Sequence, residues 1–599
     1  MRLRETLTIA LVLGGMGCAP ASVAPASAPA VAASSPPAVV PAHAPRPHAP
    51  LAVAIVVDQL SAWVAASRWP ALPRDGGFAR LIREGTWVKN MRYPYAVTDT
   101  APGHAALHTG KVPAESGIVA NELPGEAPGA RFTILRDDTT RAVTPSGLSK
   151  TVSSSAERLR APTVADRLRA AHPEALIVSV SLKDRAAILP GGKHPSHVMW
   201  FDPGLDTFVT STAFEQVFPR WAAPFGDAQA VARARSVPWE LGDRAWVEAH
   251  AAGPDDQPGE GDLDGLGTTF PHVARTAASF RALPAGDSAI LAIGLAALEA
   301  EYDPERPTLL LLSMSASDVI GHVFGPDSWE AWDQLRKLDA KLAALIETLE
   351  RRFGSVPILL AADHGNLSMP EISPARAGVS CPSDKHPSPP PDPYGRPCTT
   401  GVRIEPNALA LELTEAAKVA LGEGRWIAGI ADPYVFLSPA AKSLPEGRRA
   451  RLDQALRRTF EKHRDGVEQL IDTRMLAERC PTVLARAKGV PMRAQPGEDV
   501  LTLVCRGWAP VIGAGDYFIV PRLGSYFDGE LVSGKGASHG SPHLYDRTVS
   551  MLVRAPGLID AGAVIDDPAD FSVFSALEAA FVGLDTRAPR EILSAHVAR

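Results

Sequence analysis

The chain has 599 residues, of which 45% are hydrophobic and 21% are charged, and its formal net charge at pH 7 is -7. These proportions are ordinary for a soluble α/β protein, and the length exceeds what one small core accommodates. An acidic balance without a basic run argues against nucleic-acid binding, because phosphate backbones attract clustered Lys and Arg.

The first 49 residues predict an export signal followed by a tether. A basic start precedes the short apolar stretch 7–13 and a small-residue segment ending at Cys18, which is typical of a secretory signal over residues 1–18. Cys18 resembles the cysteine of a bacterial lipoprotein signal, but Gly15 and Met16 depart from its preferred residues, so lipidation stays open. Residues 19–49, rich in Ala and Pro, predict a disordered tether. We therefore expect an exported protein, periplasmic or at the cell surface, whose membrane attachment is limited to a lipid on Cys18.

Short apolar runs alternate with helical patterns from residue 50 to 375. The runs 51–57, 175–180, 308–315 and 356–362 are continuous and bounded by loops, which is typical of strands buried on both faces of a parallel sheet. The clearest helix covers residues 328–353, with apolar residues on one face and Gly354 after its end. This pattern predicts an α/β core with a largely parallel central sheet between helices.

The segment 98–104, Thr-Asp-Thr-Ala-Pro-Gly-His, predicts a hydroxyl group at the start of a helix. Pro102 suits the first helical turn, where its missing N–H costs nothing. Thr100 should therefore lie at or just before the helix N-terminus, facing unpaired backbone amides that bind anions such as phosphate. Thr is also a favoured helix cap, so this turn alone does not establish a nucleophile.

Acidic residues and histidines follow the predicted strands. Asp58 follows the first run, Asp318 and His322 follow the third, and Asp363 and His364 follow the fourth. Ligands bind at the carboxyl ends of parallel strands. The third-run residues Asp318 and His322 are four apart, about one helical turn, so both can reach one ion. A mixture of Asp and His suits Zn²⁺ better than Mg²⁺ or Ca²⁺, which prefer oxygen alone.

Residues 376–505 change character and predict an inserted cap that contains four cysteines. Cys381 and Cys398 bracket one loop and Cys480 and Cys505 bracket another, so these local pairs are the simplest of three pairings. We expect the core to resume over 506–599, with a strand at 516–520, a loop containing His539 and a strand at 548–553. The acidic segment 254–264 lacks the spacing of an EF-hand loop and favours a solvated insertion.

These motifs resemble those of the alkaline phosphatase superfamily, and most of all its phosphate-irrepressible, single-chain alkaline phosphatases, which use Thr in place of Ser. The likeness covers roughly residues 50–590, with the motifs in family order. It implies an alkaline-phosphatase-like fold with two Zn²⁺ per chain. His539 fits the family pattern better than His543, because the family's ligand precedes Gly. The resemblance implies one ion bound by Asp58, Thr100, Asp363 and His364, and another bound by Asp318, His322 and His539.

The resemblance also separates the chain from relatives with other substrates. A formylglycine sulfatase needs Cys or Ser followed by x-Pro-x-Arg, whereas Thr100 is followed by Ala-Pro-Gly-His. Lys183 and Arg185 match a cationic pair that phosphodiesterase relatives lack, and both point the same way if the preceding strand stays extended. Asn121 matches the family's substrate amide. Because a phosphate monoester carries roughly two negative charges and a diester about one, extra cationic donors favour the monoester.

The resemblance therefore implies a zinc-dependent phosphate monoester hydrolase of broad specificity. Thr100 would form a phosphothreonine intermediate, and Asn121, Lys183 and Arg185 would bind the phosphoryl oxygens. A phosphodiesterase or nucleotide pyrophosphatase on the same scaffold is the alternative. We expect small-molecule phosphate monoesters as substrates and a monomeric chain.

Overall fold

The structure is a computed structural model that describes residues 49–597, apart from residues 128, 384–385, 488–498 and 530. The predicted signal with Cys18, and the tether up to residue 48, lie outside the described residues. Within the described part of the chain, no helix is both long enough and apolar enough to cross a membrane.

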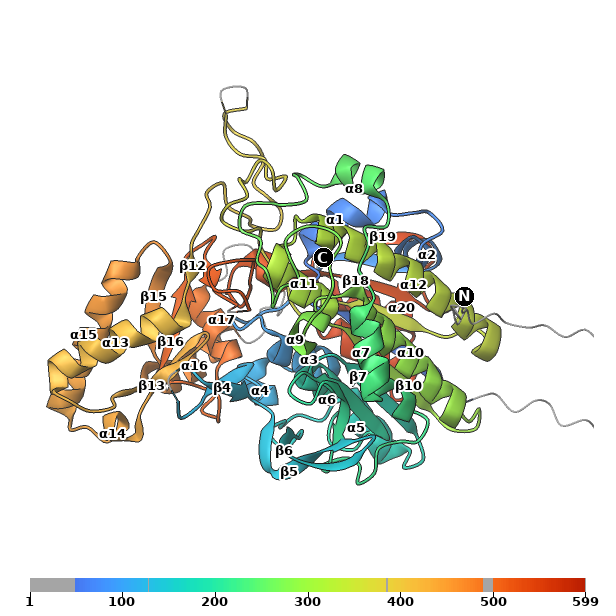
Figure 1. The fold of residues 1–599 in the computed structure, drawn as a ribbon, viewed down its shortest axis with the longest axis horizontal. Coiled ribbons are helices and arrows are strands. Elements are labelled where there is room, and N and C mark those ends of the chain that lie inside the picture. Colours follow the sequence, from blue (N-terminus) through green and yellow to red (C-terminus); the bar gives the residue numbers. More distant parts are fainter. Residues whose placement is uncertain (1–48, 128, 384–385, 488–498, 530, 598–599) are drawn as a thin grey trace, which may run out of the picture. The chain divides into compact units, whose positions relative to one another are not determined.

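A twelve-stranded sheet lies at the centre of the fold, counted over the described residues (Figure 1). Its strand order is β19-β2-β18-β11-β1-β10-β7-β8-β9-β5-β6, and β20 pairs with β2. The strands are β1 Leu51–Val57, β2 Thr86–Arg92, β5 Arg136–Thr144, β6 Gly147–Ser154, β7 Leu176–Ser181, β8 His197–Asp202, β9 Thr207–Ser211, β10 Thr308–Met314, β11 Ile358–Ala361, β18 Thr548–Arg554, β19 Ala563–Ile565 and β20 Ala569–Asp570.

The middle of this sheet is parallel and is bordered by antiparallel pairings, while β2 at the outer flank pairs in parallel with β19 and β20. β1 pairs in parallel with β10 and β11, and β7 pairs in parallel with β10 and β8. β18 runs antiparallel to β11, and β9 runs antiparallel to β8. The four predicted core strands are β1, β7, β10 and β11, and every residue in them is buried. The predicted α/β class with a parallel central region is thus confirmed.

Two groups of helices flank the sheet (Figure 1). In one group, α6 contacts β7 and β8, α19 contacts β1 and β11, and both contact α3 and α5. In the other group, α10 contacts β7 and β10 and also α12, which contacts α2 and α11. The bounds are α2 Gly77–Glu84, α3 Thr100–Thr109, α5 Val164–Ala171, α6 Asp184–Gly191, α10 Pro284–Glu301, α11 Ala316–Phe324, α12 Trp329–Phe353 and α19 Val573–Phe581.

The long predicted helix is α12, and its ends follow the expected residues. The Ser328 side chain accepts a hydrogen bond from the backbone N–H of Ala331, which satisfies one free donor of the first turn. Gly354 follows the last turn with a φ of 78°, a conformation that glycine adopts easily. The buried face contains all the apolar residues predicted for it: Trp332, Leu335, Leu338, Leu342, Leu345 and Leu349.

The cap has a sheet of its own, in the order β13-β14-β16-β15. These strands are β13 Ile427–Ala431, β14 Tyr434–Leu437, β15 Val467–Asp472 and β16 Tyr517–Pro521, and all pairs are antiparallel. Helices α13 Pro406–Leu421 and α15 Glu446–Phe460 pack against each other in this region. The strand expected at 516–520 in the resumed core is β16, so the cap extends past residue 505. Its apolar run is fully buried, and a buried cap strand therefore has the same pattern as a core strand.

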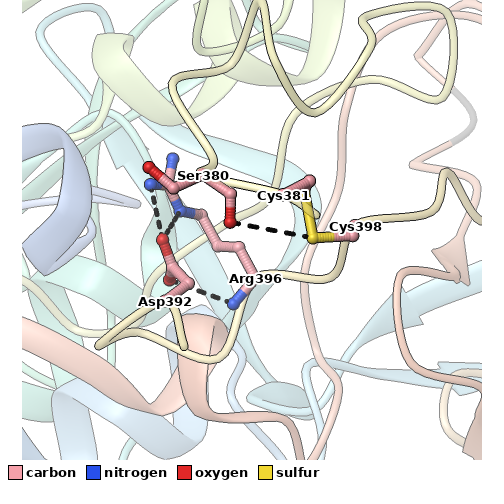
Figure 2. Close-up of a disulfide and its surroundings, with 5 residues drawn as sticks. All are labelled: Ser380, Cys381, Asp392, Arg396 and Cys398. Carbon is pink, nitrogen blue, oxygen red and sulfur yellow. Dashed lines mark hydrogen bonds and ion pairs between the residues drawn. A yellow bond between two sulfur atoms is a disulfide. The ribbon is translucent and has the colours of Figure 1, made fainter. Parts of the chain in front are cut away.

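Both predicted disulfides form in the cap. Cys480–Cys505 joins α16 Thr473–Ala487 to α17 Val500–Gly507. Figure 2 shows the other bridge, Cys381–Cys398, beside an ion pair in which Arg396 Nη2 lies 2.8 Å from Asp392 Oδ2. The same guanidinium lies 4.7 Å from the ring centroid of Trp63 in α1 Ala62–Arg68. Arg396 therefore ties the disulfide loop to the core.

Candidate active site

The carboxyl ends of four neighbouring parallel strands bring polar side chains together. Asp58 directly follows β1, Lys183 follows β7, and Asp363 and His364 follow β11. Asp318 lies in the first turn of α11, directly after β10. All five residues are buried. Because β11, β1, β10 and β7 are adjacent in the sheet, their ends form one polar surface at its edge.

Thr100 is the first residue of α3, as the sequence predicts. One turn later, a Cβ on Gly103 would lie 2.3 Å from the carbonyl oxygen of Asp363. Only glycine therefore permits α3 to approach the Asp363 loop this closely. Thr100 is 1% exposed, and the Nζ of Lys183 lies 3.2 Å from its Oγ1. The threonine hydroxyl is thus held at the strand ends.

Asp58, Asp363 and His364 form a first group of ligand candidates. His364 Nε2 lies 3.4 Å from Asp58 Oδ1 and 3.5 Å from Asp363 Oδ2. These three atoms are buried and have no hydrogen-bond partner among the described residues. One ligand atom from each residue lies within 4.8 Å of the other two. Converging, unpartnered nitrogen and oxygen donors of this kind fit a zinc ion.

Asp318, His322 and His539 form a second group. His322 Nε2 lies 3.2 Å from both Asp318 Oδ1 and His539 Nε2. The Nδ1 of His322 hydrogen-bonds the carbonyl oxygen of Ala537 at 2.8 Å. A ring whose Nδ1 donates to a carbonyl presents the lone pair of Nε2, as a metal ligand must. His543 is turned elsewhere, with its Nε2 2.9 Å from the carbonyl oxygen of Pro521.

The two groups adjoin. The rings of His364 and His539 stack with centroids 3.7 Å apart, and ligand atoms of Asp318, His364 and His539 also lie within 4.8 Å of one another. The Nζ of Lys183 lies 2.6 Å from Asp58 Oδ2 and 2.5 Å from Asp318 Oδ2. The Lys183 ammonium therefore bridges a carboxylate of the first group and one of the second.

Charged partners keep the buried site ionised. Burial alone would raise the pKa of Asp318, but His322 and Lys183 hold that pKa well below its usual range. Burial also opposes the charge on Lys183, yet the Asp318 and Asp58 carboxylates raise the pKa of its ammonium. Asp318 therefore remains a carboxylate, and Lys183 remains an ammonium, at neutral pH.

Asn121 and Arg185 differ from Lys183 in their contacts: Asn121 binds the backbone of α3, and Arg185 lies in the first turn of α6. The Oδ1 of Asn121 accepts the N–H of Ala101 in the first turn of α3 at 2.7 Å, so its amide NH₂ is left to donate elsewhere. The chain is not extended between Lys183 and Arg185, because α6 begins at Asp184. Arg185 therefore lies in a helical turn, and its buried Nε has no partner among the described residues.

Gln59 is a site residue that the sequence analysis missed. Its φ of 68° lies in the left-handed region, which is uncommon for a residue with a side chain. Its Nε2 donates to Asp318 Oδ1 at 2.9 Å, and its backbone N–H donates to Asp363 Oδ1 at 3.2 Å. Asn366 Nδ2 in turn donates to Gln59 Oε1 at 3.1 Å. Gln59 thus contacts a carboxylate in each group. In the sequence, the one feature that indicates a site role for Gln59 is its position directly after Asp58.

His104 and Asp99 are two further residues that contact ligand candidates. His104 Nδ1 hydrogen-bonds the carbonyl oxygen of Thr100 at 2.9 Å and lies 3.1 Å from Asp363 Oδ2, at ion-pair distance but outside hydrogen-bond geometry. Asp99 Oδ1 lies 3.3 Å from His539 Nδ1. Both residues belong to the same short segment as Thr100. Within that segment, His104 contacts Asp363 of the first group and Asp99 contacts His539 of the second.

Comparisons with known proteins identify a family and several relatives of this chain. Residues 52–379 match the family described as type I phosphodiesterase / nucleotide pyrophosphatase. The chain is 33% identical over 337 residues to alkaline phosphatase PhoV of Synechococcus elongatus, a match covering 53% of this chain and 60% of PhoV. It is 31% identical over 340 residues to alkaline phosphatase PafA of Elizabethkingia meningoseptica, covering 54% of this chain and 60% of PafA. The matched part thus spans 60% of the length of each of these two relatives.

Longer matches exist at lower identity. Alkaline phosphatase PhoK of a Sphingomonas species is 26% identical over 530 residues, which cover 85% of this chain and 84% of PhoK. The crystal structure of wild-type PafA superposes with a TM-score of 0.72 over 92% of this chain and 99% of that chain, at 23% identity. This likeness shows that the chain has the alkaline-phosphatase-like fold.

Proposed function

The chain belongs to the type I phosphodiesterase / nucleotide pyrophosphatase family, and we propose that it is a zinc-dependent phosphate monoester hydrolase acting through a phosphothreonine intermediate. The observation that carries this proposal is the position of Lys183, whose Nζ lies 3.2 Å from Thr100 Oγ1. Relatives named as alkaline phosphatases support it. The substrates would be small phosphate monoesters of broad variety.

Two zinc ions fit the two groups of ligand candidates. The first group, together with Thr100, would hold one ion, and the second group would hold the other. Bound zinc lowers the pKa of a hydroxyl it contacts and stabilises negative charge on a leaving oxygen. The three unpartnered donors of the first group and the Nε2 atoms of the second support this assignment.

The protein side chains account for the rest of the reaction. The Thr100 hydroxyl gives its proton to solvent water as its Oγ attacks phosphorus; the new bond to phosphorus forms as the bond to the ester oxygen breaks, and the leaving alkoxide takes a proton from water. Water then attacks the phosphothreonine, phosphate leaves, and Thr100 recovers its proton. Asn121, Lys183 and Arg185 donate to the non-bridging oxygens in both steps. Two in-line displacements retain the configuration at phosphorus.

A phosphodiesterase is the second candidate, because the family description names that activity. Charge separates the two: a monoester carries roughly one negative charge more than a diester. The Lys183 ammonium lies 3.2 Å from Thr100 Oγ1, and Arg185 follows it by two residues as a second cation. The test compares kcat/KM for an aryl phosphate monoester and the matching diester, in wild type and in Lys183→Ala. We expect wild type to prefer the monoester and Lys183→Ala to lose more monoester than diester activity. A wild-type preference for the diester would establish the second candidate instead.

We also propose that the protein is exported, through the signal in residues 1–18, to the periplasm or the cell surface. The two disulfides support an oxidising compartment. Cell fractionation of wild type and Cys18→Ala tests both parts. Cytosolic protein would contradict export, and a membrane-bound wild type with a soluble variant would show that Cys18 carries the lipid.

A further inference from the structure

An arginine of the cap reaches the loop that carries His539. Arg403 begins the short strand β12 Arg403–Ile404. Its guanidinium donates to both carboxylate oxygens of Glu371, from Nη1 to Oε1 at 2.7 Å and from Nη2 to Oε2 at 2.8 Å. Its Nε and Nη2 also donate to the carbonyl oxygen of Gly536, at 3.0 Å and 2.7 Å. This side chain, only 9% exposed, therefore joins the cap to two segments that lie outside the cap sheet.

The carbonyl oxygen of Gly536 accepts three hydrogen bonds. Two come from Arg403, and the third comes from Tyr526 Oη at 3.1 Å. Tyr526 belongs to β17 Tyr526–Phe527, which pairs in parallel with β12. A carbonyl oxygen offers two lone pairs, so the acceptor capacity of this one is fully used. Hydrogen bonds from a charged donor are the stronger kind, so Arg403 contributes most to holding Gly536 in place.

The loop at Gly536 carries part of the second group of ligand candidates. The N–H of Ala537 donates to the carbonyl oxygen of Gly321 in α11 at 3.3 Å. The carbonyl oxygen of Ala537 accepts from His322 Nδ1 at 2.8 Å, and His539 follows two residues later. A carbonyl that accepts from one ring nitrogen orients the other nitrogen toward the ion. A shift of Gly536 would therefore displace His539 and also the carbonyl that orients His322.

Glu371 keeps the contact of Arg403 close to electrically neutral. Burial alone would raise the pKa of Glu371, but the hydrogen-bonded Arg403 guanidinium holds that pKa below its usual range. Burial also opposes the charge on Arg403, yet the Glu371 carboxylate raises the pKa of the guanidinium. The two side chains therefore form an ion pair with no net charge. Such a pair affects the neighbouring ligand candidates through their geometry more than through net charge.

We propose that Arg403 is a positioning residue for the second metal ion, the one that Asp318, His322 and His539 would bind. The inference rests on the proposed zinc centre and adds a residue of the cap to it. Within the described part of the chain, no hydrogen bond or ion pair joins Arg403 or Gly536 to a member of the first group. Loss of the Arg403 contacts should therefore weaken one zinc site and spare the other.

Arg403→Lys is the test variant, because it keeps the positive charge and removes the planar fork that serves Glu371 and Gly536 together. Zinc content of the full protein is measured by elemental analysis after equilibration over a series of buffered free Zn²⁺ concentrations. Wild type should hold two ions per chain. We expect the variant to need a roughly 10- to 100-fold higher free Zn²⁺ concentration to retain its second ion, with retention of the first unchanged. Wild-type retention of both ions would overturn the proposal.

Arg396→Lys is the matched control. Arg396 also lies in the cap, where it makes two hydrogen bonds to Asp392 and one to the carbonyl oxygen of Ala377. None of these contacts reaches the second group of ligand candidates. The Tm of this variant should fall while its zinc retention matches wild type. An equal loss of zinc in both arginine variants would show a general effect of loosening the cap and would overturn the proposal.

A double-mutant cycle assigns the effect to one ion. His539→Ala should leave about one zinc ion per chain. Adding Arg403→Lys to that variant should change retention of the remaining ion by less than about twofold, because the site that Arg403 supports is already lost. A further large loss in the double variant would place the effect on the first group and contradict the proposal.

If Arg403→Lys fails to fold, Tyr526→Phe decides. It removes one of the three donors to Gly536 and should raise the free Zn²⁺ concentration needed for the second ion by roughly 3- to 10-fold, the effect of about one hydrogen bond. Wild-type retention in this variant would overturn the proposal. A wild type that binds no zinc would refute the proposed zinc centre as well, whereas two tightly held ions in every Arg403 and Tyr526 variant would refute this inference alone. None of these readouts depends on phosphatase activity.

Discussion

The central sheet and the cap are both built around buried apolar clusters, yet only one of them gathers the candidate chemistry. In the central sheet, β7, β10, β1 and β11 run parallel, so their carboxyl ends meet at one edge. In the cap, β13, β14, β16 and β15 are antiparallel, so successive ends alternate between two edges. The comparison teaches that strand direction, more than burial, brings polar residues together.

The largest expected effect lies in the core. Thr100→Ala removes the proposed nucleophile and should lower kcat/KM for an aryl phosphate by roughly four orders of magnitude or more. Zinc content, by elemental analysis, should remain near two ions per chain, because the other six ligand candidates stay. Thr100→Ser restores a hydroxyl and is the matched control, with substantial activity. Near-native turnover in Thr100→Ala would contradict the assignment of the nucleophile to Thr100 and, with it, the claim that the core carries the chemistry.

Substitution of Gln59 should give the next largest effect, which is faster loss of zinc, because Gln59 orients the ligand candidates. Gln59→Ala removes the amide that donates to Asp318 Oδ1 and should speed zinc transfer to a chelator by roughly 10- to 100-fold, as for other groups that orient ligands. Gln59→Gly also removes the amide but relieves the positive φ, so it separates the two contributions. Rapid zinc loss in both variants identifies the amide; unchanged loss in both would assign Gln59 a purely structural role.

In the cap, a covalent change should affect stability and leave the chemistry intact. Replacing both Cys480 and Cys505 by Ala removes a bridge between residues 25 apart and should lower the unfolding free energy by roughly 3 kcal/mol in the chain-entropy account. The kcat for an aryl phosphate should change by less than about twofold, since the disulfide carries none of the ligand candidates and, among the described residues, no hydrogen bond or ion pair joins either cysteine to one. Denaturant unfolding measures the expected loss of stability, and steady-state kinetics measure the expected constancy of kcat. A large fall in kcat would show that the cap shapes the site.

The smallest expected effect is a pH dependence in the core. Burial raises the pKa of Asp339 in α12 to about 6, while its unfolded value is near 4. The folded state therefore holds the proton more tightly, and this stability is present below about pH 4 and lost as pH rises through about 6, at most roughly 3 kcal/mol. Asp339→Asn keeps an acceptor for the N–H of Phe78 and should flatten that slope in denaturant unfolding between pH 4 and 7. An equal slope in both proteins would show that other groups cause it.

The sequence predicts residues whose placement depends on local pattern. β1 and β10 are continuous apolar runs, so Asp58 and Asp318 could be placed at strand ends, and Pro102 placed Thr100 at a helix start. Gln59 escaped prediction because its role depends on partners 259 and 304 residues away in the chain. β16 was expected in the core because burial in a cap sheet leaves the same apolar pattern. The acidic segment 254–264 was expected in solvent because acidic loops usually are, yet tertiary packing buries Glu260 within it.

The central claim is that Thr100 carries the phosphoryl group between two displacements. Transfer of an isotopically chiral phosphoryl group from an aryl phosphate to an alcohol acceptor reports the number of displacements directly. Two steps through Thr100 predict retention of configuration at phosphorus. Inversion would show a single direct displacement and would contradict a phosphothreonine intermediate.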